Sequence, residues 1–464
     1  MSVKVSKFGG SSLADAARMR RAAAIVLADA DRRYVVPSAP GKRSGEDRKV
    51  TDLLYTCHDL AKQGLSFAEP WGLVAERFRG IADELGLDVP IESWLGEARD
   101  GIEATSGNGP DFAASRGEAI NGRVLAALLG WGCVDASEVV WFGPRGRLDE
   151  ARTYRELGDR LRELGRAVVP GFYGRMSGPD GAGAVGGPAG VKTFSRGGSD
   201  VTGAIVARSV GASVYENWTD VPGLLITDPR VVPGAYPIEV VTYRELRELS
   251  YSGARVLHED AVFPVRSAGI PVRILSTLEP EAPGTWIVAA ADPKAEPVYE
   301  ITGIAGRSGF TAFTIEKAMM NAEVGLGMRA LTVLDRYEIS FEHMPSGVDT
   351  MTLVIDDAYF DGASAAIARE ALVAELMSAV DADEVAFDPS ISLIATVGRG
   401  MKRKPGMAAK LFGALAEAGV NIRMIDQGSS ELNITVGVDD VDYAAAVRSI
   451  YAAFVGGVEP TSDG

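Results

Sequence analysis

Four short strings combine glycines, hydroxyl groups and charged side chains in a way that suits the binding of phosphate. They are KFGGSS at Lys7–Ser12, SRGGSD at Ser195–Asp200, WTDVPG at Trp218–Gly223 and TDPR at Thr227–Arg230. Glycine lets the backbone approach an anion closely, and the N–H groups at a helix N-terminus attract negative charge. The four strings together predict a site that handles phosphate groups.

The first string predicts a strand, a glycine loop and a helix in succession. Val3 and Val5 alternate with polar residues as in a short strand, and Asp15 opens an apolar-periodic helix that extends to about Ala28. Lys7 adds a full positive charge beside the two glycines. Phosphate binding is one interpretation of this segment. An ordinary strand-to-helix turn with a solvated lysine is the other.

The common nucleotide-loop motifs do not explain the chain. The pattern GxxxxGK[ST] does not occur, and GxGxxG occurs at Gly181, Gly183 and Gly186. Pro179 and Pro188 leave no room for a helix start there. We therefore interpret this glycine-rich stretch as a flexible loop.

Length, charge and composition restrict the class of protein. A chain of 464 residues predicts about three domains, and 46% hydrophobic residues are typical of a globular protein. The net charge of −16 opposes binding to nucleic acid or to an acidic membrane surface. With neither a signal sequence nor a membrane-spanning apolar run, we expect a cytoplasmic protein. Two cysteines and three scattered histidines predict neither a disulfide framework nor a protein metal site.

Strand and helix patterns alternate up to about residue 290. Short apolar stretches separated by helical segments predict the strands YVVPS, EVVWF, RAVVPGFYG, ASVYENW and IPVRILS. This alternation indicates a mostly parallel sheet with helices on both faces, whose ligands bind at the carboxyl ends of the strands. The proline-rich stretch Glu279–Val298 is expected to be a linker or a peripheral edge.

The C-terminal third repeats itself. Ile339–Asp357 aligns without gaps on Ile422–Asp440, and the alignment pairs Asp357 with Asp440. Each copy is predicted as strand, short turn, strand, preceded by a strand, a glycine-bearing loop and a helix. We expect two small βαββ units that bind a ligand or pair with each other.

The strings, in this order and together with VVPSAPGK, SRGEAINGRVLAALL and GARVLHEDAVFPVR, resemble those of an aspartokinase. Aspartokinases belong to the amino-acid kinase superfamily and carry tandem C-terminal ACT domains. The resemblance covers nearly the whole chain. It implies an α/β fold with a mostly parallel sheet sandwiched by helices, followed by two α+β ferredoxin-like ACT units. The implied boundaries are 1–295 for the catalytic domain, 296–380 for the first ACT unit and 381–464 for the second.

The resemblance also implies a reaction. The γ-phosphoryl group of ATP would pass to the side-chain carboxylate of L-aspartate and give 4-phospho-L-aspartate, the first step of lysine, threonine and methionine biosynthesis. A carboxylate nucleophile is already ionised at neutral pH, which fits the scarcity of histidine. Mg²⁺ would be held largely by the phosphates. Lysine or threonine is the expected effector, and the ACT units are expected to form a homodimer or a higher homo-oligomer.

Three residues receive catalytic roles from the resemblance. Lys7 would contact the transferred phosphoryl group, and Arg196 would grip a carboxylate of aspartate with its planar fork. Asp200 would orient Lys7 or the metal, although its expected place as a helix N-cap could account for it alone.

The remaining roles concern binding. Glu118 would receive the α-ammonium group of aspartate, although a single helical glutamate is more often a solvated surface residue. The implied substrate contacts are Ser38, Thr51, Glu118, Arg196 and Ser199. The implied nucleotide contacts are Lys7, Gly9, Gly10, Thr219, Asp220, Leu225, Arg230 and Arg255. The implied effector contacts are Ser308, Gly309 and Phe310, with the turn Met344–Val348.

Two of these positions depart from the family pattern, and other interpretations stay open. Leu225 stands where relatives often carry tyrosine, and Arg255 where they often carry lysine. Another amino-acid kinase, such as a glutamate kinase, is the alternative enzyme, and an amino-acid sensor is the alternative from another class. The segment GKRSGEDRKVTD at Gly41–Asp52 is either a mobile lid or a charged surface loop.

Overall fold

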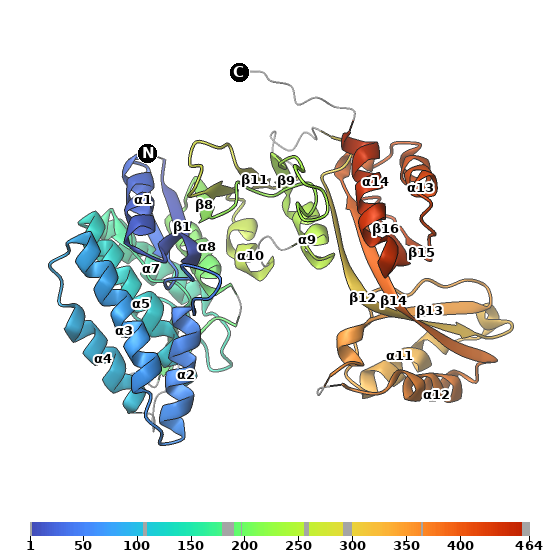
Figure 1. Ribbon diagram of the computed structural model, residues 1–464, viewed down its shortest axis with the longest axis horizontal. Coiled ribbons are helices and arrows are strands. Elements are labelled where there is room, and N and C mark those ends of the chain that lie inside the picture. Colours follow the sequence, from blue (N-terminus) through green and yellow to red (C-terminus); the bar gives the residue numbers. More distant parts are fainter. Residues whose placement is uncertain are drawn as a thin grey trace. The chain divides into compact units, whose positions relative to one another are not determined.

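The computed structural model describes residues 2–104, 109–178, 190–195, 197–254, 259–290, 299–362 and 365–456 (Figure 1). The chain divides into two compact units. The first comprises Met1–Leu224, Pro237–Tyr243 and Val256–Ala295, and the second comprises Leu225–Tyr236, Arg244–Arg255 and Glu296–Gly464. Two short segments from before residue 256 therefore fold with the C-terminal part of the chain.

The first unit is built on a mostly parallel sheet, as the sequence predicts. Eight strands of the described residues form it in the order β3-β5-β2-β1-β8-β10-β11-β9. Only the pair β10 and β11 is antiparallel within this sheet. The strands are β1 Lys4–Phe8, β2 Arg32–Pro37, β3 Gly132–Cys133, β5 Ala167–Val168, β8 Val214–Thr219, β9 Val240–Thr242, β10 Val272–Ser276 and β11 Thr285–Val288. A smaller sheet contains β4 Trp141–Phe142, β6 Tyr173–Met176 and β7 Val191–Thr193.

Helices cover both faces of the central sheet. The Tyr215 hydroxyl in β8 donates to the Asp200 carbonyl in α8. The next residue, Glu216, accepts a hydrogen bond from Arg32. Arg32 also donates to the Ile25 carbonyl in α1. Because successive side chains of a strand point to opposite faces, α8 and α1 lie on opposite sides. The helices are α1 Ala16–Leu27, α2 Val50–Lys62, α3 Ala68–Leu85, α4 Ile91–Glu103, α5 Pro110–Leu129, α6 Ala136–Val139, α7 Glu150–Leu164, α8 Gly198–Val210 and α10 Glu259–Ser267.

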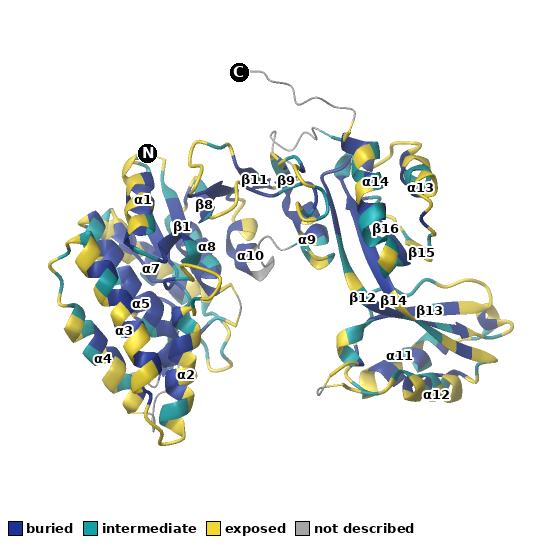
Figure 2. Ribbon diagram, viewed as in Figure 1, coloured by how far each residue is buried: buried dark blue, intermediate teal, exposed yellow. Residues whose placement is uncertain are grey.

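The predicted connection from the first strand to the first helix is confirmed. Strand β1 is buried over most of its length (Figure 2), and it leads through Gly9 into the short 3-10 helix η1, Gly10–Leu13. Helix α1 then begins behind Asp15, whose carboxylate accepts a hydrogen bond from the Arg18 backbone N–H. The stretch EVVWF is different from its prediction, because Glu138 and Val139 lie in α6 and only the last two residues form β4.

The second unit is an antiparallel sheet with helices. Among the described residues its strands lie in the order β13-β12-β14-β16-β15. They are β12 Gly303–Glu316, β13 Thr350–Asp356, β14 Glu384–Val397, β15 Met424–Asp426 and β16 Asn433–Asp439. The helices are α9 Tyr243–Tyr251, which enters this unit at its second residue, α11 Leu326–Arg336, α12 Arg369–Val380, α13 Met407–Glu417 and α14 Tyr443–Val455. The short 3-10 helices are η4 Met320–Ala322, η5 Asp357–Tyr359, η6 Arg399–Met401 and η7 Asp440–Asp442.

The internal repeat is visible in equivalent contacts of its two copies. Thr311 in β12 donates to the carboxylate of Asp357 at 2.5 Å, and Ser392 in β14 donates to the carboxylate of Asp440 at 2.6 Å. In each copy an aspartate just after a strand thus binds a hydroxyl of the long strand beside it. The pairing of these two aspartates in the sequence repeat matches this local geometry.

The first copy differs from its prediction in two respects. In the first copy, residues 339–346 form only isolated bridges to β13, through His343 and Ser346, and not a full strand. Ser308–Phe310 lies inside β12 and not in a loop before a helix. The strand register shifts between Arg307 and Phe310, and Gly309 has a φ of 92°, so this stretch is a bulge. No helix in the described ranges is long and apolar enough to cross a bilayer.

Candidate active site

An ion pair between Lys7 and Asp200 lies at the carboxyl end of β1. Lys7 is only 7% exposed, and its Nζ lies 2.6 Å from Oδ1 of Asp200. The Asn217 side-chain amide donates to the same oxygen at 2.9 Å. Lys7 and Asn217 are directly paired in the parallel register of β1 and β8. A cationic side chain is therefore held in one place at the edge where ligands of such sheets bind.

The structure corrects the capping interpretation of Asp200. Helix α8 begins at Gly198, and its N-cap is Gly197 in the left-handed conformation, with a φ of 55°. Asp200 is the third residue of the helix and directs its carboxylate to Lys7 and Asn217. Its position in the first turn still favours a negative charge, because the helix dipole is positive there.

The glycine loop closes around this ion pair. A side-chain carbon on Gly9 would lie 3.7 Å from Lys7 Nζ, so the lysine head group lies over the loop. The Gly9 N–H donates to the Trp218 carbonyl at 3.1 Å. It is thus already bonded within the protein. The N–H groups of Gly10 and Ser11 head the 3-10 helix η1, where a helix has no internal acceptors for its first donors.

Gly10 is required by close packing of two loops. A side-chain carbon on Gly10 would lie 2.8 Å from the Ala39 carbonyl oxygen, closer than real contacts allow. The Gly41 N–H donates to the Gly10 carbonyl at 2.8 Å. The loop after β2 therefore lies directly against the loop after β1.

Glu118 is buried in α5 and is not a solvated surface residue. It is 5% exposed, and the backbone N–H of Ala39 bonds its carboxyl group. Within the described part of the chain, its Oε2 has no hydrogen-bond partner. Burial raises the pKa of Glu118 to about 8, against the lowering effect of the Ala39 N–H. An unpartnered acidic oxygen in an apolar setting is costly and calls for a donor or a cation.

Three smaller side chains lie at the carboxyl ends of strands or the starts of helices. Ser38 follows β2; its N–H donates to Phe8, and its carbonyl accepts from Asn121 of α5. Ser199 is buried in the first turn of α8, and Thr51 is half-buried in the first turn of α2. The packing of Ala39 on both Gly10 and Glu118 connects the substrate side of the predicted site to the glycine loop.

The predicted nucleotide residues fall in three places. Thr219 and Asp220 follow β8, and the Thr219 carbonyl accepts hydrogen bonds from the N–H and hydroxyl of Thr277. Leu225 and Arg230 belong to the second unit, where Arg230 is exposed and pairs with Asp228 at 2.6 Å. Arg196 and Arg255 lie outside the described residues.

A recess at the same edge of the first unit carries positive charge. It encloses about 650 Å³, including its open mouth. Four cationic side chains and one carboxylate contribute to its lining, which includes Ser11, Ser12, Arg18, Arg21, Lys42, Arg43, Ser44, Asp220 and Thr277. In a chain with a net charge of −16, this local excess attracts anions to the glycine loop.

Sequence reasoning did not single out Asn217, which completes the Lys7–Asp200 contact. The sequence feature that could have identified it is the string ENWTD, in which Asn217 lies on a predicted strand two residues before Thr219. Only the register of β1 and β8 places it opposite Lys7. In the described ranges, no group of three His, Cys, Asp or Glu side chains could hold a metal ion.

Comparisons with known proteins identify the family of the chain. The amino acid kinase family matches residues 2–276, and an ACT domain matches residues 394–454. Aspartokinase 3 of Bacillus subtilis is 38% identical over 98% of this chain and 99% of its own length. The crystal structure of Clostridium acetobutylicum aspartate kinase has a TM-score of 0.88 and 45% identity, covering 98% of this chain and 100% of its own.

A more distant structure carries ligands. Escherichia coli aspartokinase III, in complex with aspartate and ADP, has a TM-score of 0.72 and 27% identity, covering 97% of this chain and 99% of its own. The same protein in complex with lysine and aspartate has a TM-score of 0.71, covering 98% of this chain and 99% of its own. The family match over more than half of the chain, and the close relatives over nearly all of it, show that this chain belongs to the aspartokinases of the amino acid kinase family and is an ATP-dependent kinase.

Proposed function

We propose that this aspartokinase transfers the γ-phosphoryl group of Mg·ATP to the side-chain carboxylate of L-aspartate and forms 4-phospho-L-aspartate. The observation that carries the proposal is the ion pair of the buried Lys7 with the half-buried Asp200 over the glycine loop. This product would begin lysine, threonine and methionine biosynthesis. The E. coli aspartokinase complex with aspartate and ADP supports the choice of ligands.

Each residue has a physical task in this reaction. The substrate carboxylate is ionised at neutral pH, so phosphoryl transfer depends on alignment and on neutralisation of charge. Lys7 supplies a positive charge to the transferred group, while Asp200 holds its Nζ and Asn217 holds the Asp200 carboxylate. The backbone N–H groups of Gly10 and Ser11 are proposed to bind the phosphates. Ser38, Thr51, Ser199 and Arg196 are proposed to bind aspartate.

Glu118 is proposed to bind the α-ammonium group of aspartate. Its unpartnered Oε2 needs a donor, and a primary ammonium group supplies both a donor and a charge. The ammonium would favour the ionised carboxylate, whose pKa burial raises in the free protein. Selection for aspartate would therefore begin at this oxygen.

Mg²⁺ would reach the site with the nucleotide, because it prefers phosphate oxygens and water over a protein cage. Asp200 and Asp220 are the carboxylates proposed to contact such an ion. When bound, the ion would neutralise charge on the phosphates. Thr219, Leu225, Arg230 and Arg255 are proposed as the other nucleotide contacts.

Trapping of the acyl phosphate tests the reaction. Hydroxylamine converts an acyl phosphate to a hydroxamate, so incubation with Mg·ATP and aspartate should give hydroxamate and ADP. Parallel reactions with glutamate and without an amino acid are the controls. Equal or greater hydroxamate from glutamate would contradict the substrate and favour a glutamate kinase. ADP release that is independent of any amino acid would contradict the reaction itself.

Control by an amino acid is proposed for the second unit. Phe310 lies in a pocket of about 260 Å³, including its mouth, that also contains Arg307 and Glu342. Arg307 binds Glu342 at 2.7 Å and Asp356 at 2.5 Å. These opposite charges suit the carboxylate and ammonium groups of a free amino acid. Lysine is the first candidate, because the E. coli relative is described as lysine-sensitive and was solved with lysine.

The rest of the effector proposal concerns neighbouring residues and assembly. Ser308, Gly309 and the turn Met344–Val348 are proposed to flank the bound effector. Strand β15, an end strand of the five-stranded sheet, would pair with or be covered by a second copy, because exposed edges favour association. We propose a homodimer or a higher homo-oligomer through the ACT units, with domain boundaries at 295/296 and 380/381.

A further inference from the structure

The loop after β2 lies directly against the glycine loop. Gly41 bonds the Gly10 carbonyl, and a side-chain carbon on Gly41 would lie 2.6 Å from the carbonyl carbon of Gly10. The two backbones are thus in direct contact. From Gly41 the chain continues through the exposed residues 42–46 to Asp47. Both ends of this short loop are held by side chains from other elements.

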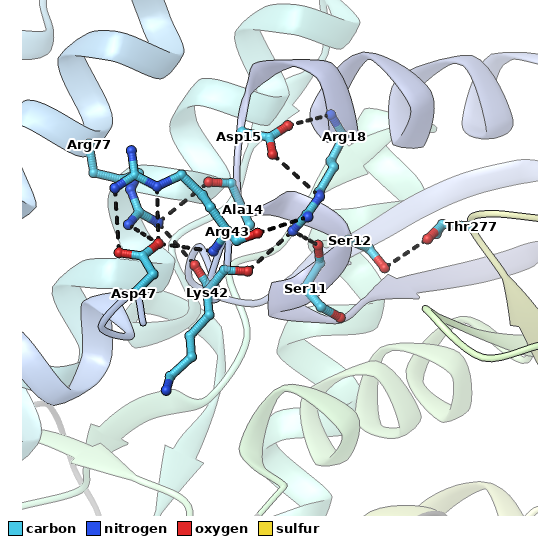
Figure 3. Close-up of polar contacts among 11 residues, drawn as sticks. Ser11, Ser12, Ala14, Asp15, Arg18, Lys42, Arg43, Asp47, Arg77 and Thr277 are labelled. Carbon is cyan, nitrogen blue, oxygen red and sulfur yellow. Dashed lines mark hydrogen bonds and ion pairs between the residues drawn. The ribbon is translucent and has the colours of Figure 1, made fainter. Parts of the chain in front are cut away.

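Arg77 of α3 holds both ends at once. This arginine is 7% exposed, and its Nη1 donates to the Gly41 carbonyl at 2.9 Å. Its Nη2 donates to Oδ2 of Asp47 at 2.6 Å. Nη1 also lies 3.5 Å from the Ala14 carbonyl, just behind the glycine loop. Figure 3 shows these contacts converging on one guanidinium group.

Two other arginines add to the same arrangement. Arg18 of α1 donates to the carbonyls of Ser11 at 3.1 Å and Lys42 at 3.2 Å, so it bridges the two loops (Figure 3). Arg43 donates to Asp47 through its backbone N–H and Nε. These hydrogen bonds, with the charge of Arg77, hold the pKa of Asp47 well below its usual range. Asp47 therefore stays ionised and keeps Arg77 paired.

A buried arginine has a cost that only its contacts offset. Burial, and then the charge of Arg43, lower the pKa of Arg77, which shows how unfavourable the setting is for the cation. Its Nε has no hydrogen-bond partner in the described part of the chain. The remaining donors reach the loop after β2 and the segment behind the glycine loop, at the edge where the phosphates of ATP would lie. A planar fork can bind a carbonyl and a carboxylate together, whereas a lysine ammonium is a single point.

We propose that Arg77, paired with Asp47, is a positioning residue for the nucleotide: it holds the loop Gly41–Asp47 against Gly10 and thereby sets the affinity for the ATP phosphates without contacting aspartate. The proposal rests on the proposed role of the glycine loop in phosphate binding. If the loop shifts, Gly10 loses the Gly41 contact and Lys42 leaves the rim of the recess.

The experiment compares Arg77→Ala with Arg77→Lys in the full chain. Loss of charged hydrogen bonds should raise KM and Kd for ATP by about tenfold or more in the alanine variant, with KM for aspartate changed less than about twofold. The KM and Kd for ATP of Arg77→Lys should lie between those of the unaltered protein and those of Arg77→Ala. Added guanidinium ion should restore part of the ATP affinity of Arg77→Ala, which a general loss of folding would not allow.

Arg79→Ala is the matched control. Arg79 lies on the same helix and also forms a two-bond pair with a carboxylate, Glu92, but this pair is on the surface. Its removal should leave both KM values unchanged. If Arg77→Ala does not fold, Asp47→Asn keeps the shape, removes the charge and should raise KM for ATP in the same selective way.

The outcomes separate this proposal from the proposed reaction. Kd for ADP, measured by calorimetry without aspartate, tests Arg77 even if aspartate proved not to be the acceptor. An unchanged Kd and KM for the nucleotide in folded Arg77→Ala, or equal increases for nucleotide and aspartate, would overturn the positioning role. Absence of hydroxamate from the unaltered protein would overturn only the reaction.

Discussion

Lys7 Nζ and Asp200 Oδ1 lie 2.6 Å apart although the residues are nearly two hundred positions apart in the sequence. Lys7 is the last residue but one of β1, and Asp200 lies in the first turn of α8. Asn217 bonds the same carboxylate oxygen, so the lysine is oriented from two elements. A preorganised cation of this kind stabilises charge that develops on a transferred phosphoryl group.

Removal of the Lys7 charge should nearly abolish turnover. Lys7→Ala is expected to lower kcat by about 10²–10³, because one preorganised donor is lost. The hydroxamate assay measures the rate, and circular dichroism checks the fold. Lys4→Ala is the control, since Lys4 lies on the same strand and pairs with Asp29 near the surface. If Lys7→Ala kept more than about a tenth of the original activity, the loss would be far smaller than the removal of a catalytic donor produces, and the proposed role would be excluded.

Aspartate binding should release a proton near pH 7. Burial raises the pKa of Glu118 to about 8, so its carboxyl group is mostly neutral in the unbound protein at pH 7. An ammonium ligand favours the ionised form, and affinity should therefore rise with pH by up to about tenfold per unit below pH 8. Calorimetry in buffers of different ionisation enthalpy counts the proton. Glu118→Gln should remove this pH dependence; its persistence in that variant would assign the proton to another group.

The same carboxyl group should make stability depend on pH. Native Glu118 keeps its proton up to a pKa of about 8, whereas the unfolded chain loses it near the ordinary glutamate pKa of 4.5. The native state therefore binds more protons in this window, and the free energy of unfolding should fall as pH rises from about 4.5 to 8. Urea titrations across this range should show a smaller slope for Glu118→Gln than for the unaltered chain. Equal slopes would mean that Glu118 is ionised in the native protein.

Gly10 and Gly9 should respond differently to alanine. A side-chain carbon at Gly10 meets the Ala39 carbonyl at 2.8 Å and must displace the loop after β2, whereas at Gly9 its nearest contacts are 3.7 Å away. Gly9 also has an ordinary φ of −68°. Gly10→Ala should lower kcat/KM for ATP on the order of 10–100-fold, through misplacement of the phosphate donors. Gly9→Ala should lower kcat/KM for ATP by a smaller factor. A larger loss for Gly9→Ala than for Gly10→Ala would contradict the packing argument.

Lysine should inhibit the enzyme through Arg307. Removal of this guanidinium in Arg307→Ala deletes the proposed carboxylate partner, and the lysine concentration for half-inhibition should rise by about tenfold or more. Arg336→Ala is the control, because Arg336 forms an exposed pair with Glu375 in the same repeat. Inhibition curves at fixed aspartate concentration make the comparison. An unchanged curve for Arg307→Ala would place the effector elsewhere, and threonine is then the next amino acid to test.

The sequence by itself determined the elements that depend on neighbours along the chain. The strand, glycine loop and helix at Lys7–Leu27 were predictable because alternation, two glycines and an N-cap aspartate all act locally. The mostly parallel sheet followed from alternating strand and helix patterns. The repeat in the C-terminal third could also be found from the sequence alone, because it is a match between two stretches of the chain.

Only the tertiary structure decided which distant residues meet. The register of β1 on β8 places Asn217 beside Lys7. Burial turns Glu118 from a surface-like glutamate into a carboxyl group that is bonded by Ala39 and whose Oε2 has no partner among the described residues. Arg77 carried no local signal, because its partners at Gly41 and Asp47 come from another loop. Hydrogen bonds between remote segments, and the burial of side chains between them, depend on tertiary packing. Such packing produces no periodic pattern in the sequence.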